Sequence, residues 1–126
     1  MSATSATTDI TAVLRGVLDR WKSGIDDHEP ERVAAAFTED AIFQGLRPYS
    51  VGRQGVTDYY AAQPLDMKVA YRILETRRLA DDLVLGYLAV DFSFTDQPTR
   101  TFRLGVLARR TGSTWLLDHY QISRLD

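Results

Sequence analysis

The chain has 126 residues, of which 44% are hydrophobic and 25% are charged, and this is the composition of one soluble globular domain. Its formal net charge is -2, so it offers no basic field to a nucleic acid. It contains no cysteine, which excludes disulfides, thiolate catalysis and cysteine-based zinc sites and fits a cytoplasmic location. No apolar run approaches the ~20 residues of a membrane helix, and the first residues lack a secretory-signal pattern, so we expect no membrane partner.

The N-terminal part predicts a short tail followed by a long helix. Residues 1–8 are small and polar and are expected to be disordered, whereas residues 9–126 are expected to form a single domain. Apolar side chains then recur at the spacing of one helix face, namely Ile10, Val13, Leu14, Val17, Leu18 and Trp21. Thr7 or Thr8 can cap this helix, and Gly24 can end it.

A second helix and a short strand are predicted next. Pro30 suits the first turn of a helix within residues 26–37, because the N–H that proline lacks has no partner there in any helix. Residues 39–45 then predict a strand that places Ile42 and Phe43 on opposite faces.

The remaining chain changes from a helical period to a period of two. A loop over residues 46–52 and a third helix over residues 53–63 are followed by four long strands, joined by turns short enough for antiparallel hairpins. The strands cover residues 67–79, 83–94, 100–110 and 115–125. Helices grouped before a run of strands indicate an α+β fold, in which three N-terminal helices pack on a curved, mostly antiparallel sheet that forms a half-open cone.

The strand over residues 83–94 is apolar on both faces. One face carries Val84, Leu88, Val90, Phe92 and Phe94. The opposite face carries Leu83, Leu85, Tyr87 and Ala89. A sheet with one solvated face alternates more cleanly, so we expect the outer face to be covered, most simply by a second copy of the chain. The prediction is a homodimer through the outer sheet face, with an overlong apolar strand in a monomer as the alternative.

The last strand mixes polar and apolar residues on both faces. Simple alternation gives one face with Trp115, Leu117, His119, Gln121 and Ser123 and another with Leu116, Asp118, Tyr120 and Ile122. Polar side chains beside tryptophan and leucine indicate a strand face that lines a cavity. From the residues alone, the odd-numbered face is either the wall of a small-molecule binding site or part of a strand end that frays into solvent.

Several motifs occur in a characteristic order along the chain. They are "VLDRW" in the first helix, "VAAAFTEDAIFQG" across the second helix and the first strand, "VGRQGVTDYY" before and within the third helix, and the closing strand "WLLDHYQIS". With these motifs, residues 9–126 resemble the SnoaL-like branch of the nuclear transport factor 2-like superfamily, which is related in fold to ketosteroid isomerases and polyketide cyclases. The resemblance implies a cone-shaped α+β barrel with a pocket at its open end, commonly homodimeric through the outside of the sheet. It implies no single reaction, because the superfamily includes several kinds of enzyme and proteins without catalysis.

The catalytic residues of these relatives have no counterparts in this sequence. By the resemblance, Gly45 stands where a ketosteroid isomerase has its base, Trp21 where it has its oxyanion tyrosine, and Val106 where it has its protonated aspartate. Glycine and valine cannot transfer protons and an indole only donates, so that isomerase activity is not expected. The Asp–His pair of the cyclases would be Asp118 and His119, which alternate to opposite faces unless a bulge intervenes.

The same comparison assigns a set of side chains to the pocket, where Tyr60 is expected to stand near Trp21. His119 is the candidate catalytic residue, as a proton carrier, because imidazoles titrate near neutral pH; a buried neutral histidine that holds a hydroxyl or carbonyl is the alternative. The substrate-binding candidates are Trp21, Phe43, Tyr59, Tyr60, Leu88, Val90, Phe92, Leu104, Val106, Gln121 and Ser123. With a single histidine in the cavity and no clustered carboxylates, no metal and no cofactor are expected.

The predicted function is the binding of a small, largely apolar organic molecule in the cone. If the chain is an enzyme, the expected chemistry is a cofactor-free acid–base isomerisation, cyclisation or dehydration. The alternative is a non-catalytic dimerisation or ligand-sensing module. Cavity volume separates the two, because a cavity below ~300 Å3 that is filled by Trp21, Phe43 and Phe92 favours the alternative.

Overall fold

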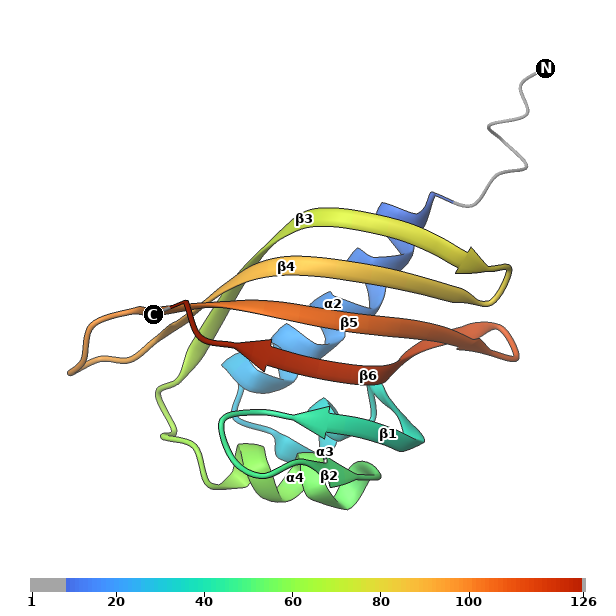
Figure 1. Cartoon of the computed structure of the whole chain (residues 1–126). Coiled ribbons are helices and arrows are strands. Elements are labelled where there is room, and N and C mark those ends of the chain that lie inside the picture. The colour runs from blue at the N-terminus through green and yellow to red at the C-terminus, as the bar shows by residue number, and fades with distance from the viewer. Residues whose placement is uncertain (1–8, 126) are drawn as a thin grey trace.

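The computed structural model describes residues 9–125, so the predicted tail, residues 1–8, lies outside the described residues. The elements in chain order are α2 (Ile10–Asp26), α3 (Pro30–Ala34), β1 (Phe37–Gln44), β2 (Ser50–Val51), α4 (Arg53–Ala61), β3 (Lys68–Ala80), β4 (Leu83–Ser93), β5 (Arg100–Thr111) and β6 (Thr114–Ser123) (Figure 1). The strands form a six-stranded sheet in the order β2-β1-β6-β5-β4-β3. Strands β1 and β6 pair in parallel, and every other neighbouring pair is antiparallel. The predicted α+β class is confirmed.

The curved sheet packs against the predicted apolar face of α2. Figure 1 shows α2 behind the long strands β3 to β6, with α3 and α4 beside β1 and β2. The side chains of α2 that face the sheet are at most 1% exposed, and they are Leu14, Val17, Leu18 and Trp21. Burial of an apolar side chain of this size contributes about 1.5–3 kcal/mol to folding, so this interface anchors the helix.

The two ends of α2 differ from the prediction. Asp9, rather than a threonine, caps the start, where its Oδ1 accepts the N–H groups of Thr11 at 3.0 Å and Ala12 at 3.3 Å. The helix continues past Gly24. A Cβ atom on Gly24 would lie 2.7 Å from Cγ2 and 2.9 Å from the backbone nitrogen of Val33. Gly24 therefore allows α3 to approach α2 closely and does not end the helix.

Replacing Gly24 by alanine should destabilise the fold, although alanine is the better helix former. The new methyl group would press against the backbone of Val33, which cannot rotate away, and overpacking of this kind costs about 1–3 kcal/mol. Gly16, on the same helix, is the matched control, because a Cβ atom there would meet nothing within 4 Å. Urea denaturation should show a lower free energy of unfolding for Gly24→Ala and a gain of up to about 1 kcal/mol for Gly16→Ala. An equal gain in the free energy of unfolding for both variants would contradict the close approach of α3 to α2.

Side chains of β4 and β5 alternate between an inner face, toward α2, and an outer face. The inner face of these strands includes Val84, Leu88, Val90, Phe92, Leu104 and Val106, each at most 9% exposed. The inner face predicted for residues 83–94 is therefore confirmed. On the outer face of β4, Leu85 is half-buried and Tyr87 is 43% exposed.

The last strand departs from simple alternation at Asp118. On β5, Ala108 pairs with Leu117, and the preceding residue, Leu107, pairs with His119. Asp118 is therefore an extra residue between two consecutive pairs, which is a β-bulge. A bulge shifts every later side chain of its strand to the opposite face.

The bulge reverses the prediction for the end of β6. Tyr120 and Ile122 are 1% and 8% exposed and point inward. His119, Gln121 and Ser123 lie on the outer face, so their predicted place in the cavity is wrong. The prediction assumes strict alternation along the strand, without an extra residue. A shift of one residue moves all later side chains to the other face.

The predicted loop over residues 46–52 also contains a short strand. In β2, Ser50 pairs with Phe43 and Val51 pairs with Ile42, so β2 is the edge strand beside β1. Two residues are too few to produce a period that sequence reasoning can detect. Within residues 9–125, no helix has the length and apolarity that crossing a membrane requires.

Candidate functional site

Aromatic side chains fill the interior of the cone. The ring of Phe43 stacks on that of Tyr120, with centroids 4.6 Å apart and planes 25° apart. Phe37 and Tyr60 each meet Phe43 edge-on at 5.7 Å, and Trp21 lies 5.9 Å from Tyr120. All five side chains are at most 3% exposed. Packed rings therefore occupy the space that an open cone would leave to a ligand.

A buried chain of hydrogen bonds joins three of these rings. Trp21 Nε1 donates to the hydroxyl of Tyr60 at 3.1 Å, which confirms that these two residues are neighbours. The hydroxyl of Tyr60 in turn donates to that of Tyr120 at 3.2 Å. Among the described residues, every buried side-chain nitrogen and oxygen atom has a hydrogen-bond partner. Since an unpaired buried polar group is costly, the chain fixes α2, α4 and β6 relative to one another.

The two buried phenols are hydrogen-bonding groups and not bases. Removal from solvent raises the pKa of Tyr60 far above its ordinary value, and the hydrogen bonds from Trp21 and to Tyr120 only partly offset this rise. Burial likewise raises the pKa of Tyr120, and the neighbouring Tyr60 adds to the rise. Both hydroxyls therefore stay protonated at neutral pH.

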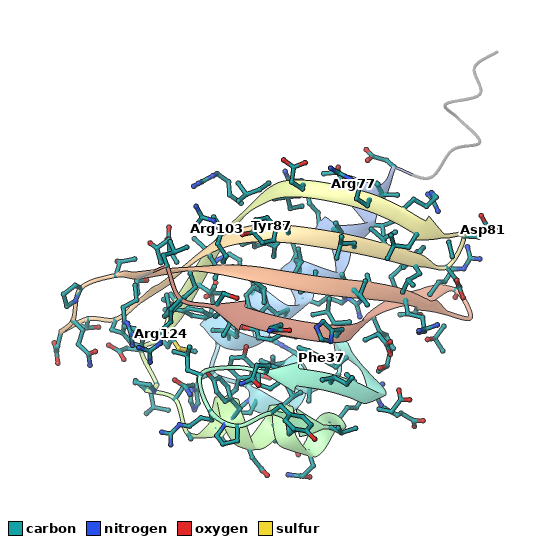
Figure 2. The ribbon with its side chains drawn as sticks, in the orientation of Figure 1. Phe37, Arg77, Asp81, Tyr87, Arg103 and Arg124 are labelled. Atoms are coloured by element: carbon teal, nitrogen blue, oxygen red, sulfur yellow. The ribbon has the colours of Figure 1, made fainter. Side chains whose placement is uncertain are left out.

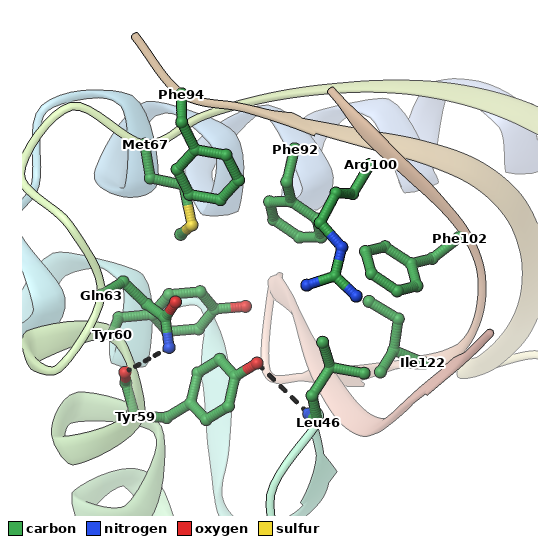
Figure 3. A pocket seen from close by; sticks show the side chains of 10 residues that line it. All are labelled: Leu46, Tyr59, Tyr60, Gln63, Met67, Phe92, Phe94, Arg100, Phe102 and Ile122. Atoms are coloured by element: carbon green, nitrogen blue, oxygen red, sulfur yellow. Dashed lines mark hydrogen bonds between the residues drawn. The ribbon is translucent and has the colours of Figure 1, made fainter. Parts of the chain in front are cut away.

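A small pocket remains at the mouth of the cone (Figure 3). Its volume is about 60 Å3, and it is lined by Leu46, Tyr59, Tyr60, Gln63, Met67, Phe92, Phe94, Arg100, Phe102 and Ile122. The hydroxyl of Tyr59 accepts the N–H of Leu46 at 3.2 Å, and Gln63 Nε2 donates to the carbonyl of Tyr59 at 3.2 Å. The lining is mainly aromatic and aliphatic, and within the described part of the chain it contains neither an acidic side chain nor a histidine.

Known proteins with this architecture were found among solved structures. A ketosteroid isomerase-like protein from Erwinia carotovora atroseptica has a TM-score of 0.79 over 95% of this chain and 99% of that chain, at 18% identity. A putative calcium/calmodulin dependent protein kinase II association domain from Xanthomonas campestris has a TM-score of 0.84 over 95% and 90%, at 18% identity. An NTF-2 like protein of unknown function from Shewanella oneidensis MR-1 has a TM-score of 0.79 over 91% and 99%, at 12% identity. The chain has an NTF2-like fold.

This likeness concerns the fold alone. No protein-family model and no curated protein matches the sequence. The superfamily that the sequence motifs resemble is confirmed at the level of the fold, whereas the SnoaL-like branch stays a prediction. An NTF2-like fold is compatible with several functions, so function depends on the side chains of the cone and of the sheet.

The NTF2-like cone brings some of the predicted site residues together. Tyr59, Tyr60 and Phe92 line the mouth pocket, and Trp21 and Phe43 lie deeper, in the aromatic cluster. The four predicted aliphatic residues are fully buried in the core without lining the pocket, and they are Leu88, Val90, Leu104 and Val106.

Three predicted pocket residues lie on the outside of the cone instead, namely His119, Gln121 and Ser123. His119 pairs with Leu107 on β5 and with Ile42 on β1, whose side chain is 45% exposed. The imidazole is therefore on the outer sheet face, and its predicted position as a proton carrier in the cavity is wrong. Tyr120 occupies the inward position, because Asp118 is bulged out of the pairing.

The bulge does not create an Asp–His pair in the cavity. Asp118 accepts a hydrogen bond from Thr38 Oγ1 at 2.8 Å and one from Arg109 Nη2 at 3.2 Å. Its carboxylate is thus held by β1 and β5 beside the strand, and His119 turns to the outer face. The cyclase-like arrangement is not formed.

Sequence reasoning missed Tyr120, Ile122, Arg100 and Phe102. The last two had a detectable signal, since they continue the alternation of Leu104 and Val106 toward the start of β5, and both line the pocket. The first two had none, because nothing in the composition of β6 marks Asp118 as the bulged residue.

The position of a ketosteroid isomerase base is closed by packing. A Cβ atom on Gly45 would lie 2.6 Å from both Cε2 and Cζ of Tyr59. A carboxylate there would displace the Tyr59 ring and its hydrogen bond with the N–H of Leu46. A proton-transferring side chain at position 45 would therefore require the Tyr59 ring to move.

Proposed function

We propose that this chain is a non-catalytic association domain that forms a homodimer through the outer face of its sheet. The observation that carries the proposal is a continuous row of side chains across five strands of that face. The aligned positions run from β2 to β4, and we call them the outer row: Val51, Ile42, His119, Leu107 and Leu85. Four of the five are aliphatic.

The outer row is only partly shielded within one chain. Val51 is 61% exposed and Ile42 is 45% exposed, and beside the row Tyr87 is 43% exposed. Figure 2 labels Tyr87 with Arg77 and Arg103, which lie diagonally from it on β3 and β5, and the residue that pairs with Tyr87 on β3 is Glu75. An apolar centre with a charged rim is the usual build of a protein interface, and a twofold dimer is the commonest way to cover such a face.

The names of two structural neighbours agree with self-association. The Xanthomonas campestris structure and one from Thiobacillus denitrificans are both putative calcium/calmodulin-dependent protein kinase II association domains. The second has a TM-score of 0.77 at 13% identity. These names support an association role. The partner that we propose, a second copy of the chain, is inferred from the outer row and not from the names.

Sedimentation equilibrium over a wide concentration range tests the proposal. We expect one species of twice the chain mass that dissociates on dilution. A monomer at all concentrations up to about 1 mM would overturn the homodimer, because specific interfaces of standard size hold far below that concentration.

The interior supports a non-catalytic role. The cavity of about 60 Å3 is well below the ~300 Å3 of common ligand sites, and Trp21, Phe43 and Phe92 occupy the interior. The phenol of Tyr60, which borders it, is held protonated, and among residues 9–125 its lining includes no carboxylate or imidazole. A general base would have to come from such groups. Location in the cytoplasm stays a prediction.

Replacing His119 by alanine should change association and leave the pocket intact. The imidazole is half-buried in the outer row, so its loss should raise the dimer dissociation constant about three- to tenfold, which corresponds to about 0.7–1.4 kcal/mol. The NMR resonances of Tyr59 and Phe92 should keep their positions. The opposite result, an unchanged dimer with altered pocket resonances, would support the catalytic reading of His119.

A second candidate function is favoured by the mouth pocket itself. We propose that it binds a small, largely apolar organic molecule, as the SnoaL-like resemblance also suggests. The aromatic lining supplies the apolar walls, and Tyr59 and Gln63 place polar atoms at its edge. Chemical-shift changes confined to the lining residues during titration with small aromatic compounds would support this function, and their absence would exclude it.

A further inference from the structure

We propose that the mouth pocket selects a small organic acid, whose apolar body enters the aromatic lining and whose carboxylate binds Arg100. This inference rests on the second function proposed above, because it specifies the chemical class of the molecule bound. It is carried by the position of a cation without an acidic partner, and it does not depend on the homodimer.

Arg100 is the charged side chain of the pocket. Its guanidinium carbon lies 5.2 Å from the centroid of the Phe102 ring, and in Figure 3 the group points into the pocket, between Phe102 and Tyr59. Among residues 9–125, the side chain of Arg100 has neither an ion pair nor a hydrogen bond. Its five N–H donors are thus open to a ligand, and a planar guanidinium matches a carboxylate in a bidentate geometry.

A second cation flanks the entrance. Arg100, Thr101 and Phe102 also line an open hollow of about 240 Å3, together with Arg124 and Leu125. Among residues 9–125, no acidic side chain belongs to the lining of either the pocket or this hollow. Two like charges that share an entrance repel each other, and an anion bound between them relieves that repulsion. Two arginines thus line the two hollows that share Arg100 and Phe102.

The acidic residue next to Met67 already accepts a hydrogen bond. Asp66, next to Met67 in the chain, uses its Oδ2 to accept the N–H of Thr95 at 2.7 Å. This bond lowers the pKa of Asp66, so its carboxylate stays charged and tied to the hairpin that follows β4. Asp66 does not belong to the lining of the pocket and forms no ion pair with Arg100 among the described residues.

The pocket limits the size of the acid. Each water-sized position takes about 10–15 Å3, so a volume of about 60 Å3 admits an apolar body of about four to six heavy atoms. A phenyl ring or a branched aliphatic group meets this limit. The carboxylate then remains at the mouth, beside Arg100, while the rings of Phe92 and Tyr60 contact the body.

The test compares acids with neutral amides of the same shape. Benzoate and benzamide, and isobutyrate and isobutyramide, are titrated into the full chain while amide and aromatic resonances are followed by NMR. We expect benzoate to bind at least tenfold more tightly than benzamide, with shifts at Phe92, Phe102 and Tyr59. Added salt at about 0.5 M should weaken the binding of the acid and leave the binding of the amide unchanged.

Two arginine variants show where the selectivity originates. Arg100→Gln should remove the preference for the acid while benzamide binds as before. The control is Arg110→Gln, because Arg110 also stacks on a ring, that of Trp115 at 5.8 Å, but lies near the other end of β5. Arg110→Gln should keep the full preference.

Three other outcomes of these titrations would overturn the inference. Equal affinities for benzoate and benzamide would overturn the inference and leave the apolar-ligand function standing. No shifts at the lining residues with any compound would overturn both. Equal shifts with sodium phosphate alone would show an anion site that does not use the apolar pocket, and would also overturn the inference.

Discussion

Replacing Tyr87 by glutamate should convert the proposed homodimer into monomers. Tyr87 projects from the middle of β4, next to the outer row, and pairs across β5 with Gly105, where a side chain would meet no neighbour within 4 Å. The tyrosine ring therefore stands above its surroundings on that strand, which is the position of an interface anchor. A glutamate there would bring one charge from each copy into the buried seam, directly opposite Glu75 on β3.

The expected effect of Tyr87→Glu is large. Leaving an unpaired charge in a buried interface costs about 3–5 kcal/mol, so the dissociation constant should rise at least on the order of 100-fold. Sedimentation equilibrium at a concentration where the wild type is fully dimeric measures this change. Far-ultraviolet circular dichroism should be unchanged, because Tyr87 takes no part in the core.

Leu65→Glu is the matched control for this prediction. Leu65 is 77% exposed but lies between α4 and β3, away from the outer sheet face. The same charge at that position should leave the dimer intact. If both variants dissociate equally, charge repulsion between chains explains the effect, and the outer row is not the interface.

The fold could be predicted from the sequence wherever a periodic pattern is long. The apolar face of α2 repeats over four turns, and β4 alternates over eleven residues, so both elements and their buried faces were correctly identified. Such patterns repeat the same physical requirement many times, and a single exception does not hide them. The short strand β2 has no such repetition, and the sequence pattern of its residues predicts a loop.

The candidate site could be predicted only in part, because it depends on one bulged residue. Tyr59, Tyr60 and Phe92 were found from the faces of α4 and β4. For the end of β6, the predicted inner and outer faces are reversed. Asp118 leaves the strand pairing, so that Tyr120 and not His119 points to the inner face. A bulge is stabilised by contacts from other strands, here Thr38 and Arg109, that are remote in sequence.

Raising the pH above 10 should unfold the protein steeply, because two buried phenols must stay neutral in the fold. Burial raises the pKa of Tyr60 and of Tyr120 above the ordinary tyrosine value of about 10 that applies in the unfolded chain. Below pH 10 both states hold these protons, so stability is unaffected. Above pH 10 the unfolded chain loses them while the folded chain keeps them, and the free energy of unfolding falls by about 3 kcal/mol per pH unit for the pair.

A third tyrosine acts in the same direction. Tyr71 donates its hydroxyl proton to Asp19 Oδ1 at 2.5 Å, and burial, with this hydrogen bond, raises the pKa of Tyr71 to about 12. Its contribution to stability is therefore present below pH 10 and is lost between pH 10 and about 12. Because this side chain is partly exposed, solvent screening makes its contribution smaller than that of the buried pair.

Tyrosinate absorbance and urea denaturation at pH 8, 10 and 11 measure this behaviour in the full chain. Of the six tyrosines, Tyr60, Tyr71 and Tyr120 should ionise only as the protein unfolds, so absorbance and circular dichroism should change together. In Tyr120→Phe one buried phenol is gone, and the slope of the free energy of unfolding should fall by about 1.4 kcal/mol per pH unit, which is half of the contribution of the buried pair. Tyr49→Phe, at a position 65% exposed, should leave the slope unchanged. Reversible ionisation of all six tyrosines near pH 10 in a still-folded chain would mean that the interior admits water, and the packed cone, with the non-catalytic role inferred from it, would have to be abandoned.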